Sequence, residues 1–91
     1  MTQISVEQSD KNKDNFKVIV KDSNSVRDFK VQLNDNYFHD LVSDKKITKE
    51  ALIKKSFEFL LARESKEQIL SEFYLSEIQR YFPDFKKEIM L

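Results

Sequence analysis

The feature that most constrains the fold of this chain is a wide apolar stripe between residues 52 and 61. At about 100° per residue the apolar side chains cover about 200° of arc, which is wider than the stripe of a typical surface helix. Thr48 suits the N-cap position, and Ile47 and Leu52 have the spacing of a hydrophobic staple. We therefore predict a central helix over about residues 49–63 that packs against two partners at once.

Two short segments upstream alternate apolar and polar side chains, as half-buried strands do. They are residues 16–21 and 27–33, and residues 22–25 between them offer turn chemistry without glycine. The side chains that share one face are Phe16, Val18, Val20, Phe29, Val31 and Leu33. An isolated hairpin needs a packing surface. We therefore predict an α+β fold in which an antiparallel β-hairpin packs against three to four helices.

The first fifteen residues are polar apart from Ile4 and Val6. Such a composition is typical of a flexible lead-in. We predict a flexible N-terminal segment over residues 1–15 and a single α+β domain over residues 16–91. The alternative is an extra edge strand over residues 3–7.

Local signals predict further helical segments on both sides of the central helix. An Asn-Asp-Asn run precedes residues 37–42, which predicts one or two helical turns there. Ser65 and Gln68 have the spacing of a capping box and predict a helix that continues through Ile69, Leu70 and Phe73.

The last eighteen residues predict two more short helices. Ser76 is a candidate N-cap, with Ile78, Tyr81 and Phe82 facing inward, and a proline at position 83 ends this helix near Phe82. A final helix would then bring Phe85 and Ile89 together on one face.

The chain contains no glycine and no cysteine. Phosphate-binding loops, dinucleotide fingerprints and nucleophile elbows all depend on glycine, so the sequence argues against those sites. His39 is the only histidine, and without cysteine it cannot build a metal site of the usual zinc type. We predict no cofactor, no metal and no catalytic site. The lack of cysteine, signal peptide and long apolar run favours a cytoplasmic protein that does not enter a membrane.

The charges balance to zero in the whole chain and in each half. Nucleic-acid-binding proteins usually carry a basic excess, so this balance makes a nucleic-acid partner the weaker prediction. One local group of lysines could still contact an anion near the start of the central helix. It consists of Lys45, Lys46, Lys49, Lys54 and Lys55. A solvated face is the common meaning of such a run.

Aromatic residues beside an arginine mark a candidate recognition surface near the C-terminus, because Tyr and Arg are enriched at interface hot spots. The residues are Tyr74, Arg80, Tyr81 and Phe82. Aromatics at helical spacing also occur in cores, so both interpretations stay open.

A longer pattern resembles a family of small stand-alone bacterial proteins whose activity is uncharacterised. It begins at Ser56 and reads S-F-x-F-L-L-x-R-E-x-x-E-x-I-L, followed by I-x-R-Y-F-P. The family often has Pro where this chain has Ser65, and Gly where it has Gln79. The polar or amphipathic positions of the pattern are Arg63, Glu64, Arg80 and Tyr81. The resemblance implies either a buried network or a shared recognition surface at these positions.

Together these observations predict a non-catalytic protein-interaction module with a protein partner. The alternative is a weak nucleic-acid or phosphate-ligand binder that uses the lysine group.

Overall fold

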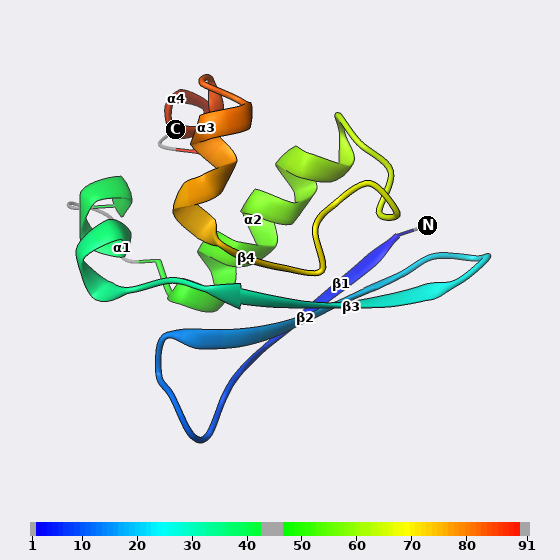
Figure 1. Ribbon diagram of the computed structural model, residues 1–91, viewed down its shortest axis with the longest axis horizontal. Helices are drawn as coiled ribbons and strands as arrows, with labels where there is room; N and C mark the ends of the chain where they lie inside the picture. Colours follow the sequence, from blue (N-terminus) through cyan, green and yellow to red (C-terminus); the bar gives the residue numbers. More distant parts are fainter. Residues whose placement is uncertain (1, 43–46, 90–91) are drawn as a thin grey trace.

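The predicted hairpin forms the middle of a four-stranded sheet, and the helices described by the structure cover one face of it (Figure 1). The computed structural model describes residues 2–42 and 47–89. The strands lie in the order β1 (Gln3–Gln8), β2 (Asn15–Lys21), β3 (Val26–Gln32) and β4 (Glu72–Tyr74). The helices are α1 (Asp35–Val42), α2 (Lys49–Leu61), a 3₁₀ turn η1 (Leu75–Glu77), α3 (Ile78–Tyr81) and α4 (Phe85–Ile89). The α+β class is confirmed, with a mixed sheet in place of a lone hairpin.

Strands β2 and β3 pair antiparallel, with Val18 opposite Phe29. The six side chains that alternation assigned to one face are all buried against the helices. In the connecting turn, the Asp22 side-chain oxygen accepts the backbone N–H groups of Asn24 and Ser25 at 2.8 and 3.0 Å. No described residue has a positive φ, so this turn needs no glycine.

Helix α2 is the central helix that the apolar stripe predicts. The Thr48 hydroxyl accepts the Ala51 backbone N–H at 3.1 Å, which confirms the N-cap. Phe57 is fully buried, and its ring packs against Phe29 of β3 at 5.1 Å and Phe73 of β4 at 6.0 Å. The stripe therefore contacts the sheet, while its Phe59 packs against Phe85 of α4 at 5.2 Å.

The N-terminal segment is a strand and not the predicted flexible lead-in. Residues Gln3–Gln8 form β1, which pairs antiparallel with β2 and places Ile4 opposite Val20 and Val6 opposite Val18. Ile4 and Val6 are half-buried against the core. The polar composition does not indicate this strand, because backbone hydrogen bonds to β2 stabilise β1 and only two of its side chains are apolar. Residues Gln3–Gln8 are thus part of the same sheet as the predicted hairpin.

The segment after α2 is not the predicted helix. The Ser65 backbone N–H does bond to the Gln68 side-chain oxygen, as a capping box requires, but only a turn forms. The chain then extends into β4, which pairs parallel with β3 and places Phe73 beside Val31. Pairing with the free edge of β3 buries Phe73 and satisfies backbone groups, and this tertiary gain outweighs local helix signals.

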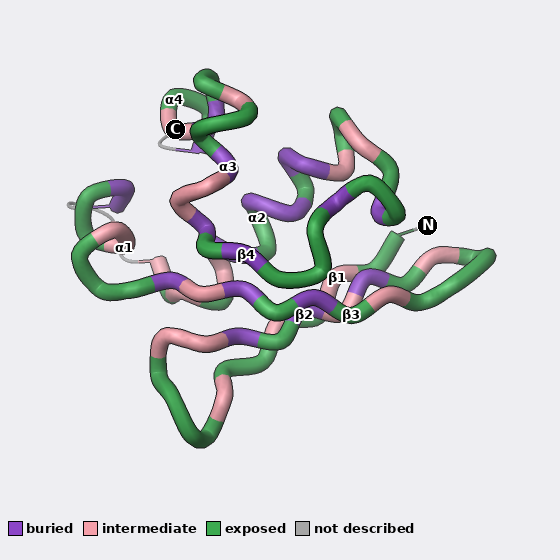
Figure 2. The backbone as a smooth tube through the Cα atoms, in the orientation of Figure 1, coloured by how far each residue is buried: buried purple, intermediate pink, exposed green. Residues whose placement is uncertain are grey.

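The shorter helices follow the predictions in part. The Asn34 side chain accepts the Tyr37 backbone N–H at 2.8 Å and begins α1, as expected. Phe85 and Ile89 of α4 are both buried, also as expected. Ser76 is not the N-cap that the sequence predicts. Instead, the Glu77 carboxylate accepts the Tyr74 backbone N–H at the start of the 3₁₀ turn η1, which leads into α3. Tyr81 does not face inward: 69% of it is exposed, and Figure 2 shows the exposed stretch at the end of α3.

Candidate functional site

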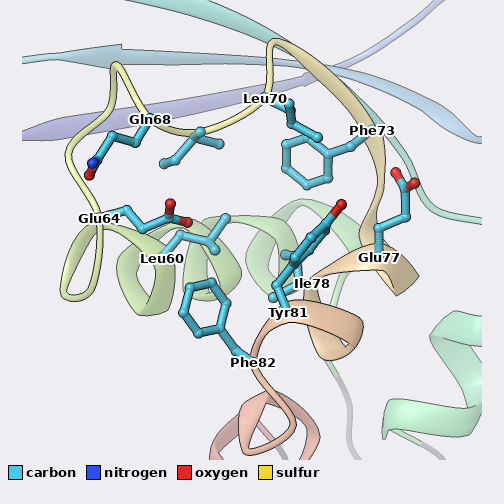
Figure 3. Close-up of a pocket in the computed structure, with 10 residues that line it drawn as sticks. Leu60, Glu64, Gln68, Leu70, Phe73, Glu77, Ile78, Tyr81 and Phe82 are labelled. Carbon is cyan, nitrogen blue, oxygen red and sulfur yellow. The ribbon is translucent and has the colours of Figure 1, made fainter.

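A groove of about 320 Å³ lies between α3, the end of α2 and the 64–73 segment (Figure 3). Most of its lining is apolar: Leu60, Ile69, Leu70, Phe73, Ile78, Tyr81 and Phe82. The polar residues of the lining are Glu64, Gln68 and Glu77. Ile69, Phe73 and Ile78 are buried and belong to the core, whereas Leu70 and Tyr81 are 56% and 69% exposed. The groove thus has a floor of core side chains, and one exposed apolar side chain stands on each of its two sides, which are called its banks below.

A buried lysine holds the bank formed by the 64–70 segment. Lys66 is only 7% exposed, and its ammonium group forms ion pairs with Asp22 in the β2–β3 turn and with Glu67 at 3.0 Å. The hydrogen bond from Lys66 lowers the pKa of Asp22 to about 2, and the same bond raises the pKa of Lys66. Since the pair joins residues forty-four positions apart, it anchors this bank to the sheet.

The opposite bank is α3 together with the turn before it. The Glu77 carboxylate accepts the Tyr74 backbone N–H at 2.9 Å, which begins the helical turn directly after β4. Ile78 then enters the core, and Phe82 packs edge-on against Phe59 at 5.9 Å. These contacts leave Tyr81 on the groove side of the helix, as Figure 3 shows.

The structure separates Arg63 from its neighbour Glu64. The Arg63 guanidinium lies over the Phe59 ring, 3.7 Å from its centroid, and donates to the Phe59 carbonyl at 3.1 Å. It also forms an ion pair with Glu88 of α4 at 3.0 Å. Arg63 therefore joins α2 to α4, and Glu64 lines the groove.

The remaining predicted recognition residues are also divided. Tyr81 and Phe82 line the groove, but Arg80 and Tyr74 do not. Both are exposed, and Tyr74 lies on β4 with 56% of its surface accessible. The positions Arg63, Glu64, Arg80 and Tyr81 thus do not form one network within the described part of the chain.

Sequence reasoning missed Leu70 and Glu77 as site residues. The prediction places Leu70 within a helix; that helix does not form, and Leu70 lies on a bank of the groove. Glu77 is the third residue after the N-cap Tyr74, and this pair lacks the Ser or Thr by which a capping box is recognised in a sequence.

Three of the five lysines of the predicted group, Lys49, Lys54 and Lys55, have a described position. Lys49 forms ion pairs with Asp35 and, at 3.6 Å, with Asp14, and its side chain is only 14% exposed. The Lys49 hydrogen bond lowers the pKa of Asp35. Lys54 and Lys55 are exposed on α2, and Lys45 and Lys46 lie outside the described residues. Lys49, the described lysine at the start of α2, is therefore already paired with two carboxylates.

Two further features of the described residues bear on the predictions. No group of three or more His, Cys, Asp or Glu side chains among residues 2–42 and 47–89 is placed to hold a metal ion. None of the helices in this part of the chain is long and apolar enough to cross a membrane.

Comparison with protein-family models, with curated proteins and with solved structures found no match to this chain.

Proposed function

We propose that this protein is a non-catalytic interaction module, and that a protein partner inserts a bulky apolar side chain into the groove between α3 and the 64–73 segment. The observation that carries the proposal is the exposure of Leu70 and Tyr81 on facing banks above an apolar floor. Hot-spot residues of interfaces lie in well-packed, desolvated pockets and are enriched in Tyr, Trp and Arg.

The size of the groove supports a side chain as the occupant. Its volume of about 320 Å³ is at the lower end of the range of roughly 300–1,000 Å³ for small-molecule sites. A single anchoring side chain with its adjacent backbone suits this space.

The chemistry of the lining supports binding in preference to catalysis. Its titratable side chains are Glu64, Glu77 and the phenol of Tyr81. Of these, Glu77 is engaged by a backbone N–H. Covalent catalysis would need a nucleophile within hydrogen-bond reach of a base. The described part of the lining contains no Ser, Thr, Cys, His or Lys, and its Tyr81 hydroxyl forms no hydrogen bond with Glu64 or Glu77.

The test compares two variants that remove equally exposed apolar side chains. Leu70 and Val26 are both 56% exposed, but Val26 lies on β3 and does not line the groove. We expect quantitative cross-linking in an extract of the native cells to recover a defined partner with wild type and with Val26→Ser, and to lose it with Leu70→Ser. Retention of the same partners by Leu70→Ser, or recovery of none by wild type, would contradict the proposal.

A further inference from the structure

The two ends of the groove each carry a carboxylate. Figure 3 shows Glu64 at one end and Glu77 at the other, with Leu70 and Tyr81 between them. None of the lining residues within 2–42 and 47–89 is basic. The groove is therefore apolar along its length and acidic at both ends, although the chain as a whole is neutral.

The two cations nearest to Glu64 in the sequence are engaged elsewhere, and Arg80, three residues after Glu77, is exposed and does not line the groove. Arg63 is held by the Phe59 ring and by Glu88. Lys66 is buried between Asp22 and Glu67. Among the residues that the structure describes, no cation forms an ion pair with Glu64 or Glu77, so both carboxylates can pair with a cation of a ligand.

The Glu77 carboxylate is also fixed in position. Its Oε2 accepts the Tyr74 backbone N–H at 2.9 Å, and this bond leaves the second oxygen of the group for another donor. A cation that approaches this end of the groove would therefore meet a preorganised acceptor. Preorganisation lowers the entropic cost of binding.

We infer that the groove recognises a basic amphipathic peptide segment of a partner protein, with one bulky apolar side chain flanked on both sides by Lys or Arg. This inference rests on the proposed function and specifies its partner. The apolar side chain enters between Leu70 and Tyr81, and the flanking cations reach Glu64 and Glu77. Charge complementarity of this kind contributes mainly to specificity and to the rate of association.

The experiment titrates the isotope-labelled full chain with three short synthetic peptides and follows the binding by NMR. The peptides share a central leucine and differ only in its flanks, which are lysine, glutamine or glutamate. We expect shifts centred on Leu70, Ile78 and Tyr81, with the lysine peptide binding about fivefold to tenfold more tightly than the glutamate peptide at low salt. The preference should shrink as salt is raised, because exposed charges are screened.

A double variant, Glu64→Gln with Glu77→Gln, tests the role of the carboxylates. Glutamine keeps an oxygen that can accept the Tyr74 N–H, so the cap before α3 is preserved. The variant should bind the three leucine-centred peptides with equal affinity, whether the flanking residues are lysine, glutamine or glutamate. The matched control is Glu58→Gln, since Glu58 is an exposed glutamate of α2 outside the groove lining, and it should retain the preference.

The outcomes separate this inference from the proposed function. Equal binding of the three peptides, or an unchanged preference in the double variant, would overturn the basic partner and leave the groove as an apolar site. Equally tight binding of a free aromatic amine such as phenethylamine would overturn the peptide as occupant. The absence of groove shifts with every peptide would overturn the inference, while the partner-capture experiment with Leu70→Ser decides the proposed function independently.

Discussion

The packing of Phe57 offers a quantitative test of how α2 is joined to the sheet. Phe57 is fully buried and contacts one ring from β3 and one from β4: Phe29 at 5.1 Å and Phe73 at 6.0 Å. Replacement by leucine keeps an apolar side chain but removes both aromatic contacts. The lost contacts and the small cavity should destabilise the protein by about 1–2 kcal/mol. Since a chain of 91 residues has a stability of about 5–14 kcal/mol, the variant should still fold.

A double-mutant cycle isolates the contact between Phe57 and Phe29. We expect Phe29→Leu to cost about the same as Phe57→Leu, and the two together to cost less than their sum by about 0.5–1.5 kcal/mol. The measurement is urea unfolding followed by circular dichroism, with the slope of the transition compared among the four proteins. Val26→Ala is the control, since Val26 is exposed and should change stability by less than about 0.5 kcal/mol. A coupling below about 0.3 kcal/mol would refute the packing described for these two rings.

Three further predictions concern caps and ion pairs. Thr48→Ala removes the acceptor of the Ala51 N–H and should destabilise the protein by about 1 kcal/mol in the same urea assay; an unchanged midpoint would contradict the cap. Arg63→Lys keeps the charge but loses the planar group over the Phe59 ring, and should cost about 0.5–1 kcal/mol. Asp22→Asn keeps an oxygen for the turn but removes the charge beside Lys66, so it should be less stable than wild type at neutral pH. Because the folded-state pKa of Asp22 is lowered from 3.8 to about 2, its stabilisation is present above 3.8 and is lost as pH falls towards 2. The unfolding midpoints of the two proteins should therefore converge over that pH window, and a constant difference would rule out the charge effect.

Those parts of the fold that depend on local pattern could be predicted from the sequence. The wide stripe of α2, its Thr48 cap and the alternation in β2 and β3 each arise from residues close together in the chain. Their spacing alone therefore identifies the element and its buried face.

The parts that the sequence did not reveal depend on pairing between distant residues. Strand β4 has three residues. It forms because it pairs in parallel with the edge of β3, which lies some forty positions earlier in the chain. No local signal distinguishes Phe73 in such a strand from Phe73 in a helix, and the capping box at Ser65 favoured the helix. Strand β1 is similar, since its two apolar residues are too few to show a period.

The candidate site follows from the same pairing. The predicted helix runs through Leu70 and Phe73; in the structure β4 takes Phe73 into the sheet, and Leu70 remains exposed on the bank of the groove. Three of the predicted recognition residues, Glu64, Tyr81 and Phe82, do line the groove, but the position of Leu70 opposite Tyr81 could not be inferred without the β3–β4 pair.

Because Leu70 is exposed, its contribution to partner binding can be measured separately from its contribution to the free energy of unfolding. A side chain that is 56% exposed contributes little to the core, so Leu70→Ser should change the free energy of unfolding by less than about 0.5 kcal/mol. Phe73, in contrast, is 7% exposed beside Leu70 in the same segment, and Phe73→Ala should cost about 3–5 kcal/mol. If Leu70→Ser loses its partner while its unfolding curve matches wild type, the loss arises from the groove itself. If it unfolds as easily as Phe73→Ala, then Leu70 is a core residue and the groove described here is wrong.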